Sequence, residues 1–238
     1  MKTISKKILL LGAIMLSISS NLYADDSPFS GPYVGAHLSR VEASMTQEDS
    51  DCWFNCSAYT QNADSFGYGI QGGYNWVNEN LLLGVEARYT AGGPDETFEA
   101  GYYNNPPEDM KYTSELKNLL SLRFRTGLVL NKTAIILSAG LAQGDFDHEF
   151  RDQRNSGEDP SDDDVATYSG DTSGWVTGIG IEHAFTDHIL VGVGYSQYSF
   201  DIEQSNVIGD NGTGTNFGYI VKFVDTANTF DISVSYTF

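Results

Sequence analysis

The sequence predicts an all-β protein, an eight-stranded antiparallel transmembrane β-barrel preceded by an N-terminal signal peptide. Three observations lead to this prediction. The chain ends on a strand in which apolar and polar residues alternate strictly. Eight segments in all carry a strand-like apolar pattern, and the connections between them alternate between short and long.

The last strand, residues 230–238, is the most regular segment of the chain. Phe230, Ile232 and Val234 alternate with polar residues, and the pattern continues to the final residue. A period of two gives a strand one apolar and one polar face. Strands of bacterial outer-membrane barrels turn the apolar face to lipid and the polar face to the interior. The segment therefore indicates an outer-membrane protein that contacts lipid.

The N-terminus has the features of a secretory signal peptide. Three lysines precede an apolar run over residues 8–18, and Ala24 is the expected cleavage site. This run of about 11 residues is too short to cross a bilayer as a helix, and no run of about 18 apolar residues follows it. An exported membrane protein of this kind must close its backbone hydrogen bonds as a barrel. We therefore predict a signal peptide at 1–24 and a barrel domain at 25–238.

The charge of the chain excludes one class of partner. There are 32 acidic and 13 basic residues, which gives a formal net charge of −19 at pH 7. Three of the basic residues lie in the predicted signal peptide, so the exported part is more acidic still. Such a chain does not neutralise phosphates, and nucleic acid is not an expected partner. The sequence carries no motif for a cofactor, and none is expected.

The eight predicted strands are spread over the whole exported chain. They lie at 32–45, 65–77, 81–91, 110–130, 133–146, 173–185, 189–200 and from about 217 to 238. The faces of the fifth are hard to assign, because residues 135–137 are apolar on both sides. Two further stretches, 97–103 and 219–224, are strand-like. We interpret them as strands that extend above the membrane, although they would also permit a ten-stranded barrel.

The connections alternate in length along the chain. Short turns are predicted at 78–80, 131–132 and 186–188, and long loops at about 46–64, 92–109, 147–172 and 201–226. Outer-membrane barrels have this layout, with short periplasmic turns, long external loops and an even number of strands. Large aromatic residues gather near the short turns, as an interfacial girdle requires; these are Tyr74, Trp76, Phe185, Tyr236 and Phe238.

At four places the sequence resembles the outer-membrane β-barrel domain family, which includes small OmpA/OmpX-type barrels, opacity-type porins and surface antigens. The resemblance lies in Gly31–Ala36, in the hairpin Gly72–Glu86, in Arg123–Gly127 and in Gly174–Asp187. It covers residues 31–238 apart from the long loops. It implies the eight-stranded OmpA/OmpX-type barrel and says little about activity. Together with the strand pattern and the loop lengths, we predict a monomeric barrel in the outer membrane of a Gram-negative bacterium.

The end of the chain also resembles a known signal. Its terminal pattern, with Tyr236 and Phe238, is similar to the signal read by the barrel-assembly machinery, which we therefore expect as a partner. The predicted seventh strand departs from OmpA-like barrels in one respect. Its inward positions are Gly192, Gly194 and Ser196 rather than charged residues, so any charge network in the lumen must come from other strands.

Alternation directs a small set of ionisable side chains inwards: His37, Glu86, Arg88, Arg123, Arg125 and Glu182. An eight-stranded barrel is only wide enough for side chains to fill its interior, and buried charges must be paired. We interpret the set as a polar plug that closes the barrel. The alternative is a narrow porin that passes small ions or solutes through the same charges.

Catalysis is a second alternative, because some small barrels modify lipid. Hydrolysis needs a nucleophile, a base within reach and an orienting acid. His37, Ser39 and Glu86 could form such a set, although nothing in their spacing singles them out. His183 should face lipid, His188 lies at a turn, and His148 begins an acidic loop. We expect a protein that is not an enzyme and has no catalytic residues.

The long loops are the expected site of interaction with an extracellular or host ligand. Cys52 and Cys56 lie in the first loop, and an oxidising compartment favours a disulfide between them. The acidic loop at 147–172 could bind Ca²⁺ or Mg²⁺, but it has no calcium-loop spacing, and no metal site is predicted. The sequence thus favours a structural or surface-interaction role with display of acidic external loops.

Deletion of Phe238 should lower the amount of folded protein in the outer membrane, because it removes the last residue of the predicted assembly signal. The measurement is heat-modifiable mobility on gels of isolated outer membranes. Mobility and abundance equal to those of the unaltered protein would contradict the prediction.

Overall fold

The computed structural model describes residues 27–49, 58–100, 110–152, 164–201, 203–210 and 216–238. The strands are β1 Gly31–Asp49, β2 Ala58–Asn78, β3 Leu81–Ala91, β4 Asp95–Ala100, β5 Met110–Leu130, β6 Thr133–Asp152, β7 Asp164–Ala184, β8 Ile189–Phe200, β9 Glu203–Asp210 and β10 Asn216–Thr237. No helix in these segments has the length and apolar character needed to cross a membrane.

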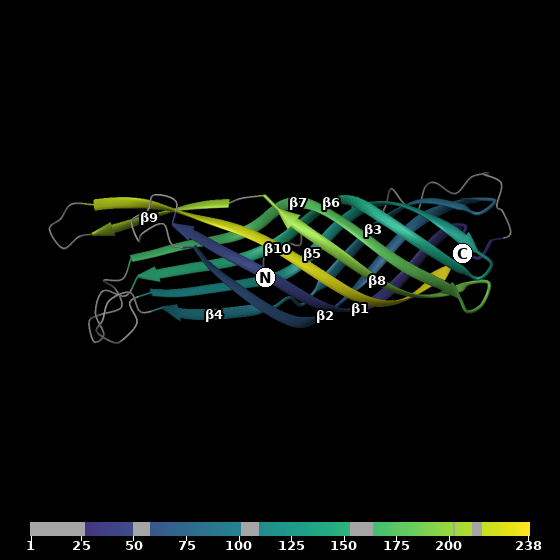
Figure 1. Cartoon of the computed structure of the whole chain (residues 1–238), viewed down its shortest axis with the longest axis horizontal. Coiled ribbons are helices and arrows are strands. Elements are labelled where there is room, and N and C mark those ends of the chain that lie inside the picture. The colour runs from purple at the N-terminus through teal and green to yellow at the C-terminus, as the bar shows by residue number, and fades with distance from the viewer. Residues whose placement is uncertain (1–26, 50–57, 101–109, 153–163, 202, 211–215) are drawn as a thin grey trace.

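Eight strands form a closed antiparallel ring in the order β1-β2-β3-β5-β6-β7-β8-β10, and β10 pairs with β1 to close it (Figure 1). The predicted eight-stranded barrel is confirmed. The other two strands do not enlarge the ring, since β4 continues the path of β3 along β5 and β9 continues the path of β8 along β10. The stretch 219–224 is part of β10 itself.

Two of the short turns are two-residue hairpins with tight backbone geometry. Glu79 follows β2 with φ of 54°, and Asn131 follows β5 with φ of 58°. Two-residue hairpins favour positive φ because their twist then matches that of the strands. Asn adopts this conformation readily, whereas Glu does so less often. Both turns lie where the sequence predicts them.

Several strands are longer than the sequence predicts. β2 begins at Ala58 rather than at 65, β6 continues to Asp152 rather than ending at 146, and β7 begins at Asp164 rather than at 173. Much of the predicted loop sequence is therefore strand. A strand needs only about 9–11 residues to cross a bilayer, so about half of each of these strands extends beyond it.

The sequence pattern does not predict these added strand segments, because the apolar residues change from the outward face of the strand to its inward face. We call this change the exchange of polarity. On β1 the outward residues Val34 and Leu38 are apolar, whereas the next outward residue, Arg40, is charged. The inward face changes in the opposite sense, from buried Ser39 to buried Val41. The alternation continues unbroken, but the apolar face moves from the outside to the inside. We call the part of the barrel between the short turns and this exchange the inner half, and the part beyond the exchange the outer half. The inner half thus resembles a membrane barrel, whereas the outer half resembles a water-soluble one.

The exchange also explains the ambiguous fifth predicted strand. Ile135 and Leu137 of β6 point outwards with exposed fractions of 43% and 54%, whereas Ile136 points inwards and is 4% exposed. Further along the same strand, Asp145 is outward and Phe146 is fully buried. An apolar run on both faces therefore marks a place where the lumen, as well as the lipid, is apolar.

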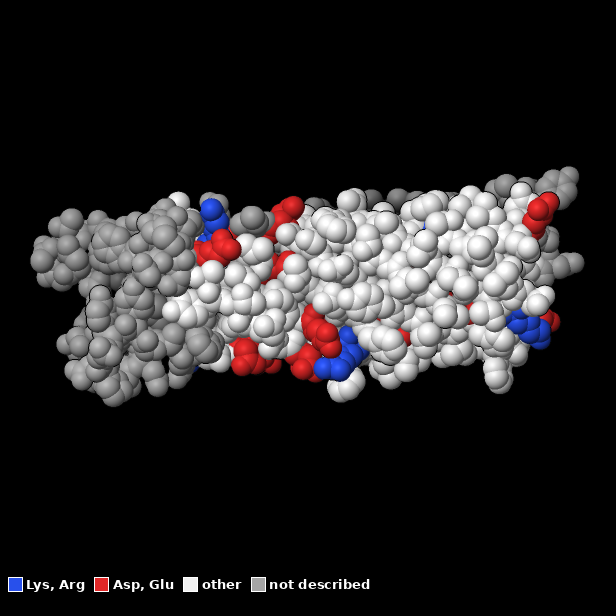
Figure 2. All heavy atoms as spheres, in the orientation of Figure 1, with Lys and Arg blue, Asp and Glu red and all other residues white. Residues whose placement is uncertain are grey.

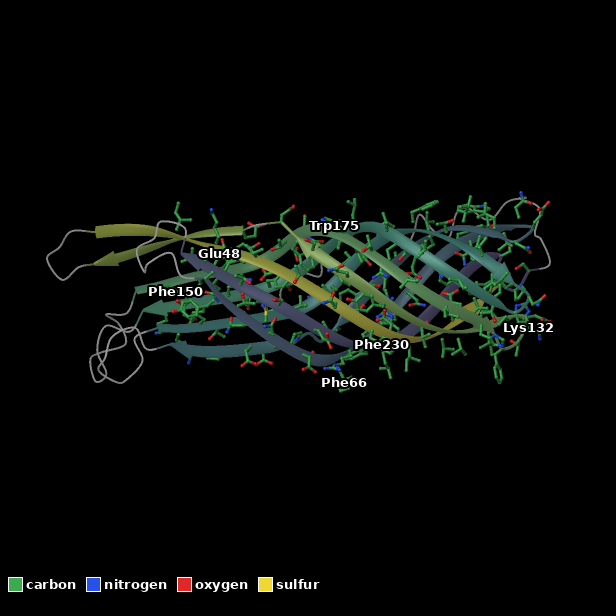
Figure 3. The ribbon with its side chains drawn as sticks, viewed as in Figure 1. Glu48, Phe66, Lys132, Phe150, Trp175 and Phe230 are labelled. Carbon is green, nitrogen blue, oxygen red and sulfur yellow. The ribbon has the colours of Figure 1, made fainter. Side chains whose placement is uncertain are left out.

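Exposed apolar side chains form a belt around the inner half, and Figure 2 shows it as a broad band without charged groups. The belt runs from Phe66 to Trp76 on β2 and from Phe230 to the C-terminal Phe238. These lengths match a transmembrane strand. Besides the predicted girdle near the short turns, a second aromatic girdle borders the outer half, with Phe66, Trp175 and Phe230 labelled in Figure 3. Tyr195 belongs to it as well, because it lies opposite Phe230 on the neighbouring strand.

Beyond the belt the ring divides into two four-stranded sheets. β3 stops pairing with β2 after Ala91, where Gly92 has a φ of 83°, and β4 then follows β5. On the opposite side β8 leaves β7 and β9 follows β10. The outer half therefore consists of the sheets β9-β10-β1-β2 and β4-β5-β6-β7 (Figure 1).

Because of the exchange of polarity, substitution by arginine should lower the stability of the folded protein by different amounts at two outward positions of β8. Val193→Arg lies in the belt and should destabilise the folded protein by about 2–4 kcal/mol, because it places a charge in lipid. Gln197→Arg lies beyond the belt and should change the stability by less than about 0.5 kcal/mol. Denaturant unfolding in lipid vesicles measures both. Equal costs at the two positions would contradict the assignment.

Candidate functional site

The interior of the barrel is filled in layers. Near the short turns lies an inner apolar layer of Phe29, Val77, Leu82, Val129, Ala134, Ile136, Ala184 and Leu190. In the outer half lies an outer apolar layer of Val41, Ala43, Met45, Leu116, Leu119, Ala142, Phe146, Val176, Tyr198, Phe200 and Ala227. Between the two lies a cluster of charged side chains, and this charged lumen is the candidate functional site.

Arg125 of β5 is the centre of one half of the charged lumen. Its guanidinium donates to Oε1 of Glu182 at 2.5 Å and to the hydroxyl of Tyr33, and it lies 3.4 Å from Oε2 of Glu86. The Tyr33 hydroxyl donates in turn to Glu86 at 2.8 Å. The guanidinium carbon also lies 5.2 Å from the centre of the Tyr33 ring. Four strands are thus joined across the lumen by one cation.

Arg88 of β3 is the centre of the other half. Its Nη1 donates to Oδ2 of Asp231 at 2.9 Å, and its Nε donates to Nδ1 of His37 at 3.4 Å. Asp231 also accepts a hydrogen bond from Ser39. Asp231 was not among the predicted lumen residues, although the alternation of the last strand places it on the polar face. This alternation is the sequence signal that identifies Asp231 as a lumen residue.

Arg123 is buried without a carboxylate in direct contact. It donates to three hydroxyl groups, to Ser121 and Ser196 at 2.9 Å each and to Tyr198 at 2.5 Å. Its charge is balanced at longer range, because the lumen contains three arginines and three carboxylates. The three acids are Glu86, Glu182 and Asp231. A balanced set of this kind avoids the large cost of an unpaired buried charge.

The six predicted lumen residues all point into the barrel. His37, Glu86, Arg88, Arg123 and Arg125 are buried, and Glu182 is partly buried. On the side of β7 and β8, the absence of side chains at Gly180, Gly192 and Gly194 leaves a cavity of about 50 Å³. Oε2 of Glu182 is buried and has no hydrogen-bond partner in the described part of the chain. A cavity of this size has room for a few water molecules.

The residues considered for catalysis do not form a connected set. Nε2 of His37 pairs with Thr90 at 2.9 Å, Ser39 donates to Asp231, and Glu86 binds Tyr33 and Arg125. His183 faces outwards and His188 lies at a turn, as the sequence predicts. Among the described contacts, the hydroxyl of Ser39 is bound to Asp231, and no hydrogen bond joins it to His37 or Glu86.

His148 is placed differently from the prediction. The sequence places it at the start of an acidic loop, but it lies on β6 inside the outer half and is 2% exposed. Its Nδ1 is 3.0 Å from Oγ of Ser114, and its Nε2 is 2.9 Å from Oδ2 of Asp225. The ring stacks on Phe223 at 4.6 Å. Sequence reasoning missed this cluster because it lies in the added length of the strands.

The cluster joins the two outer sheets and is closed to solvent. Ser114 donates to Gln61 at 2.7 Å and accepts from Gln47 at 3.1 Å, so Nδ1 of His148 must donate to the serine oxygen. A serine in this state is not activated by the histidine, and Ser114 and Asp225 are 0% and 2% exposed. The arrangement contains a serine, a histidine and an aspartate but has the hydrogen bonding of a structural contact.

Outside the membrane-spanning part, Lys117 of β5 forms an ion pair with Asp147 of β6. Partial burial acts to raise the pKa of Asp147, but hydrogen bonds from Lys117 and Ser169 and the charge of Lys117 outweigh it, and the net shift is downwards. The hydrogen bond to Asp147 raises the pKa of Lys117. Both side chains are more than a third exposed, so the pair contributes little to stability.

Some predicted features lie outside the described residues. These are the signal peptide, Cys52, Cys56 and the centre of the acidic loop. Within the described segments, no group of three or more His, Cys, Asp or Glu side chains is arranged to hold a metal ion.

Comparison with known proteins assigns the family. The model of the outer membrane protein beta-barrel domain matches residues 8–238, and the chain belongs to this family. The protein is therefore located in the outer membrane. No curated protein matches the sequence.

Solved structures with a similar fold have low sequence identity. Neisserial surface protein A is 16% identical, with 88% of this chain and 98% of that chain covered and a TM-score of 0.43. The attachment invasion locus protein Ail of Yersinia pestis is 11% identical, with 87% and 99% covered and a TM-score of 0.42. The outer membrane protease OmpT of Escherichia coli is 10% identical, with 93% and 100% covered and a TM-score of 0.50. At such identities the likeness concerns the fold alone.

Because Arg88 and Asp231 form an ion pair, we expect substitutions at the two positions to have non-additive effects on the free energy of unfolding. Asp231→Asn leaves Arg88 buried without its carboxylate, and should destabilise the folded protein by about 3–5 kcal/mol. Arg88→Met combined with Asp231→Asn should cost less than the sum of the two single changes, because it leaves no unpaired charge. Denaturant unfolding of all four proteins gives the coupling energy. Additive costs would show that the pair does not act as a unit.

Proposed function

We propose that the protein is a non-enzymatic outer-membrane barrel with a closed lumen, whose role is to hold an acidic, two-sheet structure at the cell surface for interaction with a partner. The observation that carries the proposal is the layered interior. A pore requires a continuous polar path, whereas here the charged lumen lies between two apolar layers. Apolar constrictions oppose the passage of ions.

The length of the strands supports the interaction part of the proposal. A barrel that served only to occupy the membrane would need strands of about 9–11 residues, but β2, β5 and β7 each have 21. The outer half is held together by its own apolar core and by the cluster around His148. Such a core makes the outer half a rigid structure rather than a set of loops. Its surface also carries most of the exposed acids of the described chain.

A narrow porin is the alternative that one observation favours. The cavity beside Glu182 is polar, and Gly180, Gly192 and Gly194 leave it open on one side of the lumen. Water in this cavity could join a wider path if either apolar layer opened. The inner layer includes Phe29, which precedes β1 and is held by side-chain packing and a local hydrogen bond. Movement of Phe29 is the simplest way to open the periplasmic end.

Planar-bilayer recordings decide between a closed barrel and a pore. We expect no stepwise currents from the folded protein, because the charged lumen lies between the two apolar layers. We also expect none from Phe29→Ala, since Met45, Leu116 and Phe146 still close the outer side. Heat-modifiable mobility serves as the control for correct folding. Stepwise openings of the unaltered protein would overturn the closed-barrel proposal and favour the porin.

A further inference from the structure

The hydrogen bond between His148 and Asp225 joins one outer sheet to the other. His148 lies on β6 and Asp225 lies on β10, and these strands belong to different sheets of the outer half. The two side chains are 0% and 2% exposed, so water does not share the contact. Nε2 of His148 is 2.9 Å from Oδ2 of Asp225, which is the distance of a hydrogen bond. The number of protons that this contact needs follows from the hydrogen bonds around it.

The hydrogen bonds of Gln61 determine which atom donates at Nδ1 of His148. Nε2 of Gln61 donates to the backbone carbonyls of Tyr112 at 3.0 Å and Glu96 at 3.3 Å, so the amide oxygen of Gln61 points towards Ser114. The hydroxyl of Ser114 has one hydrogen to donate, and it donates this hydrogen to the amide oxygen at 2.7 Å. Nδ1 of His148, which is 3.0 Å from the same hydroxyl, must therefore carry a hydrogen of its own.

The contact at Nε2 then requires an additional proton. A neutral imidazole carries a hydrogen on only one of its two nitrogens. Because Nδ1 carries it, Nε2 of a neutral His148 can only accept a hydrogen bond. An ionised carboxylate also only accepts, and two acceptors at 2.9 Å would repel one another. We therefore infer that one proton is held between Nε2 of His148 and Oδ2 of Asp225.

Loss of this proton would leave a buried carboxylate without a donor. Oδ1 of Asp225 has no hydrogen-bond partner in the described part of the chain, and Oδ2 contacts His148. The imidazole ring is stacked on Phe223 at 4.6 Å and on Phe146 at 5.8 Å, and aromatic faces attract a cation. An unpaired carboxylate in this apolar core has a high free energy, and it can be hydrated only if the two sheets move apart.

Two further ionisable groups, on β7 and β9, lie near the pair. The ring centre of Tyr168 is 6.1 Å from that of His148. Burial raises the pKa of Tyr168, and the charges of Glu203, Asp171 and Asp225 add to this rise. Ionisation of Tyr168 or of Glu203 is therefore the effect that an experiment has to separate from the proton of the pair.

The remaining strands present uncharged side chains to the pair. The residues that β1, β2 and β5 direct to it are Gln47, Gln61 and Ser114. On β6 itself, Asp147 and Glu149 flank His148 in the sequence and lie on the outward face, where Lys117 and Arg151 bind them. Within the described residues, Asp225 is thus the charged group in direct contact with the imidazole.

We propose that the His148–Asp225 pair makes the outer half sensitive to pH: the two outer sheets stay together while the pair holds its proton and separate when the proton is lost. The proposal rests on the proposed function as far as regulation is concerned, because separation of the sheets changes the surface that the outer half offers to a partner. The closed form holds one proton that the separated groups can release to water. Low pH therefore favours the closed form, and a rise in pH favours the open one.

The distance between the two outer sheets is the quantity to measure. Spin labels would be placed at the outward residues Thr46 of β1 and Thr167 of β7, in folded full-length protein whose Cys52 and Cys56 are replaced by serine. Double electron–electron resonance in lipid vesicles should give one distance at acid pH and a second, longer distance as the pH is raised. The ratio of open to closed protein should rise by up to about tenfold per pH unit, the factor for one proton.

Asp225→Asn is the variant that separates the proton from the contact. The amide of the asparagine can donate to Nε2 of a neutral His148, so the hydrogen bond forms without the additional proton. This variant should keep the short distance at every pH. Tyr168→Phe and Glu203→Gln remove the other ionisable groups and should retain the pH dependence of the unaltered protein. Heat-modifiable mobility is the control for correct folding of each variant.

Three results would overturn the proposal. The first is a distance between the sheets that does not change with pH in the unaltered protein. The second is a pH dependence that persists in Asp225→Asn, and the third is one that is lost in Tyr168→Phe or Glu203→Gln. The last two would assign the titration to another group.

Nuclear magnetic resonance of protein labelled with ¹⁵N-histidine tests the pair without a change at Asp225. The signals of His148 are identified by their loss in His148→Gln. Nδ1 should carry a hydrogen in the closed form, and an Nδ1 without hydrogen would overturn the proposal. None of these measurements involves a partner or bilayer conductance, so failure here is distinct from failure of the proposed function.

Discussion

Because side chains on a β-strand alternate without interruption, a strand that passes from lipid into water must exchange the polarity of its two faces. The rest of this structure depends on that constraint. In the inner half, lipid requires an apolar outside, and the polar inside must satisfy itself through the balanced set of arginines and carboxylates. In the outer half, water permits a charged outside, and the inside becomes an apolar core. The exchange occurs between Leu38 and Arg40 on β1 and between Phe230 and Asn228 on β10.

The structure of the outer half also determines whether the lumen of the inner half is closed. The apolar core that stiffens the outer half is also the layer that closes the charged lumen from outside, so rigidity above the membrane and closure within it have the same physical origin. The ring can divide into two sheets only in the outer half, because water can hydrogen-bond an unpaired strand edge and lipid cannot. Gly92 and the register shift beside Leu116 place this division just beyond the aromatic girdle that contains Phe66.

The fold was predictable where the sequence obeys the membrane pattern. The hairpin around Glu79, the turn at Asn131 and the inward position of Arg123 and Arg125 follow from alternation and turn chemistry alone. The outer half was not predictable by the same rule, because its polar outward residues look like loop sequence. His148 was assigned to a loop for this reason. Alternation also places Asp231 on the inward face of the last strand, whereas its pairing across the ring with Arg88 of β3 is not visible in the sequence of either strand.

The most direct test of the exchange of polarity is the accessibility of spin labels along the outward face of β1. Labels would be placed one at a time at Val34, Leu38, Glu42 and Ser44 of the protein in lipid vesicles, and collision with oxygen would be compared with collision with a water-soluble nickel chelate. The account predicts oxygen-dominated collision at Val34 and Leu38 and chelate-dominated collision at Glu42 and Ser44. Oxygen-dominated collision at all four positions, or chelate-dominated collision at Leu38, would contradict it.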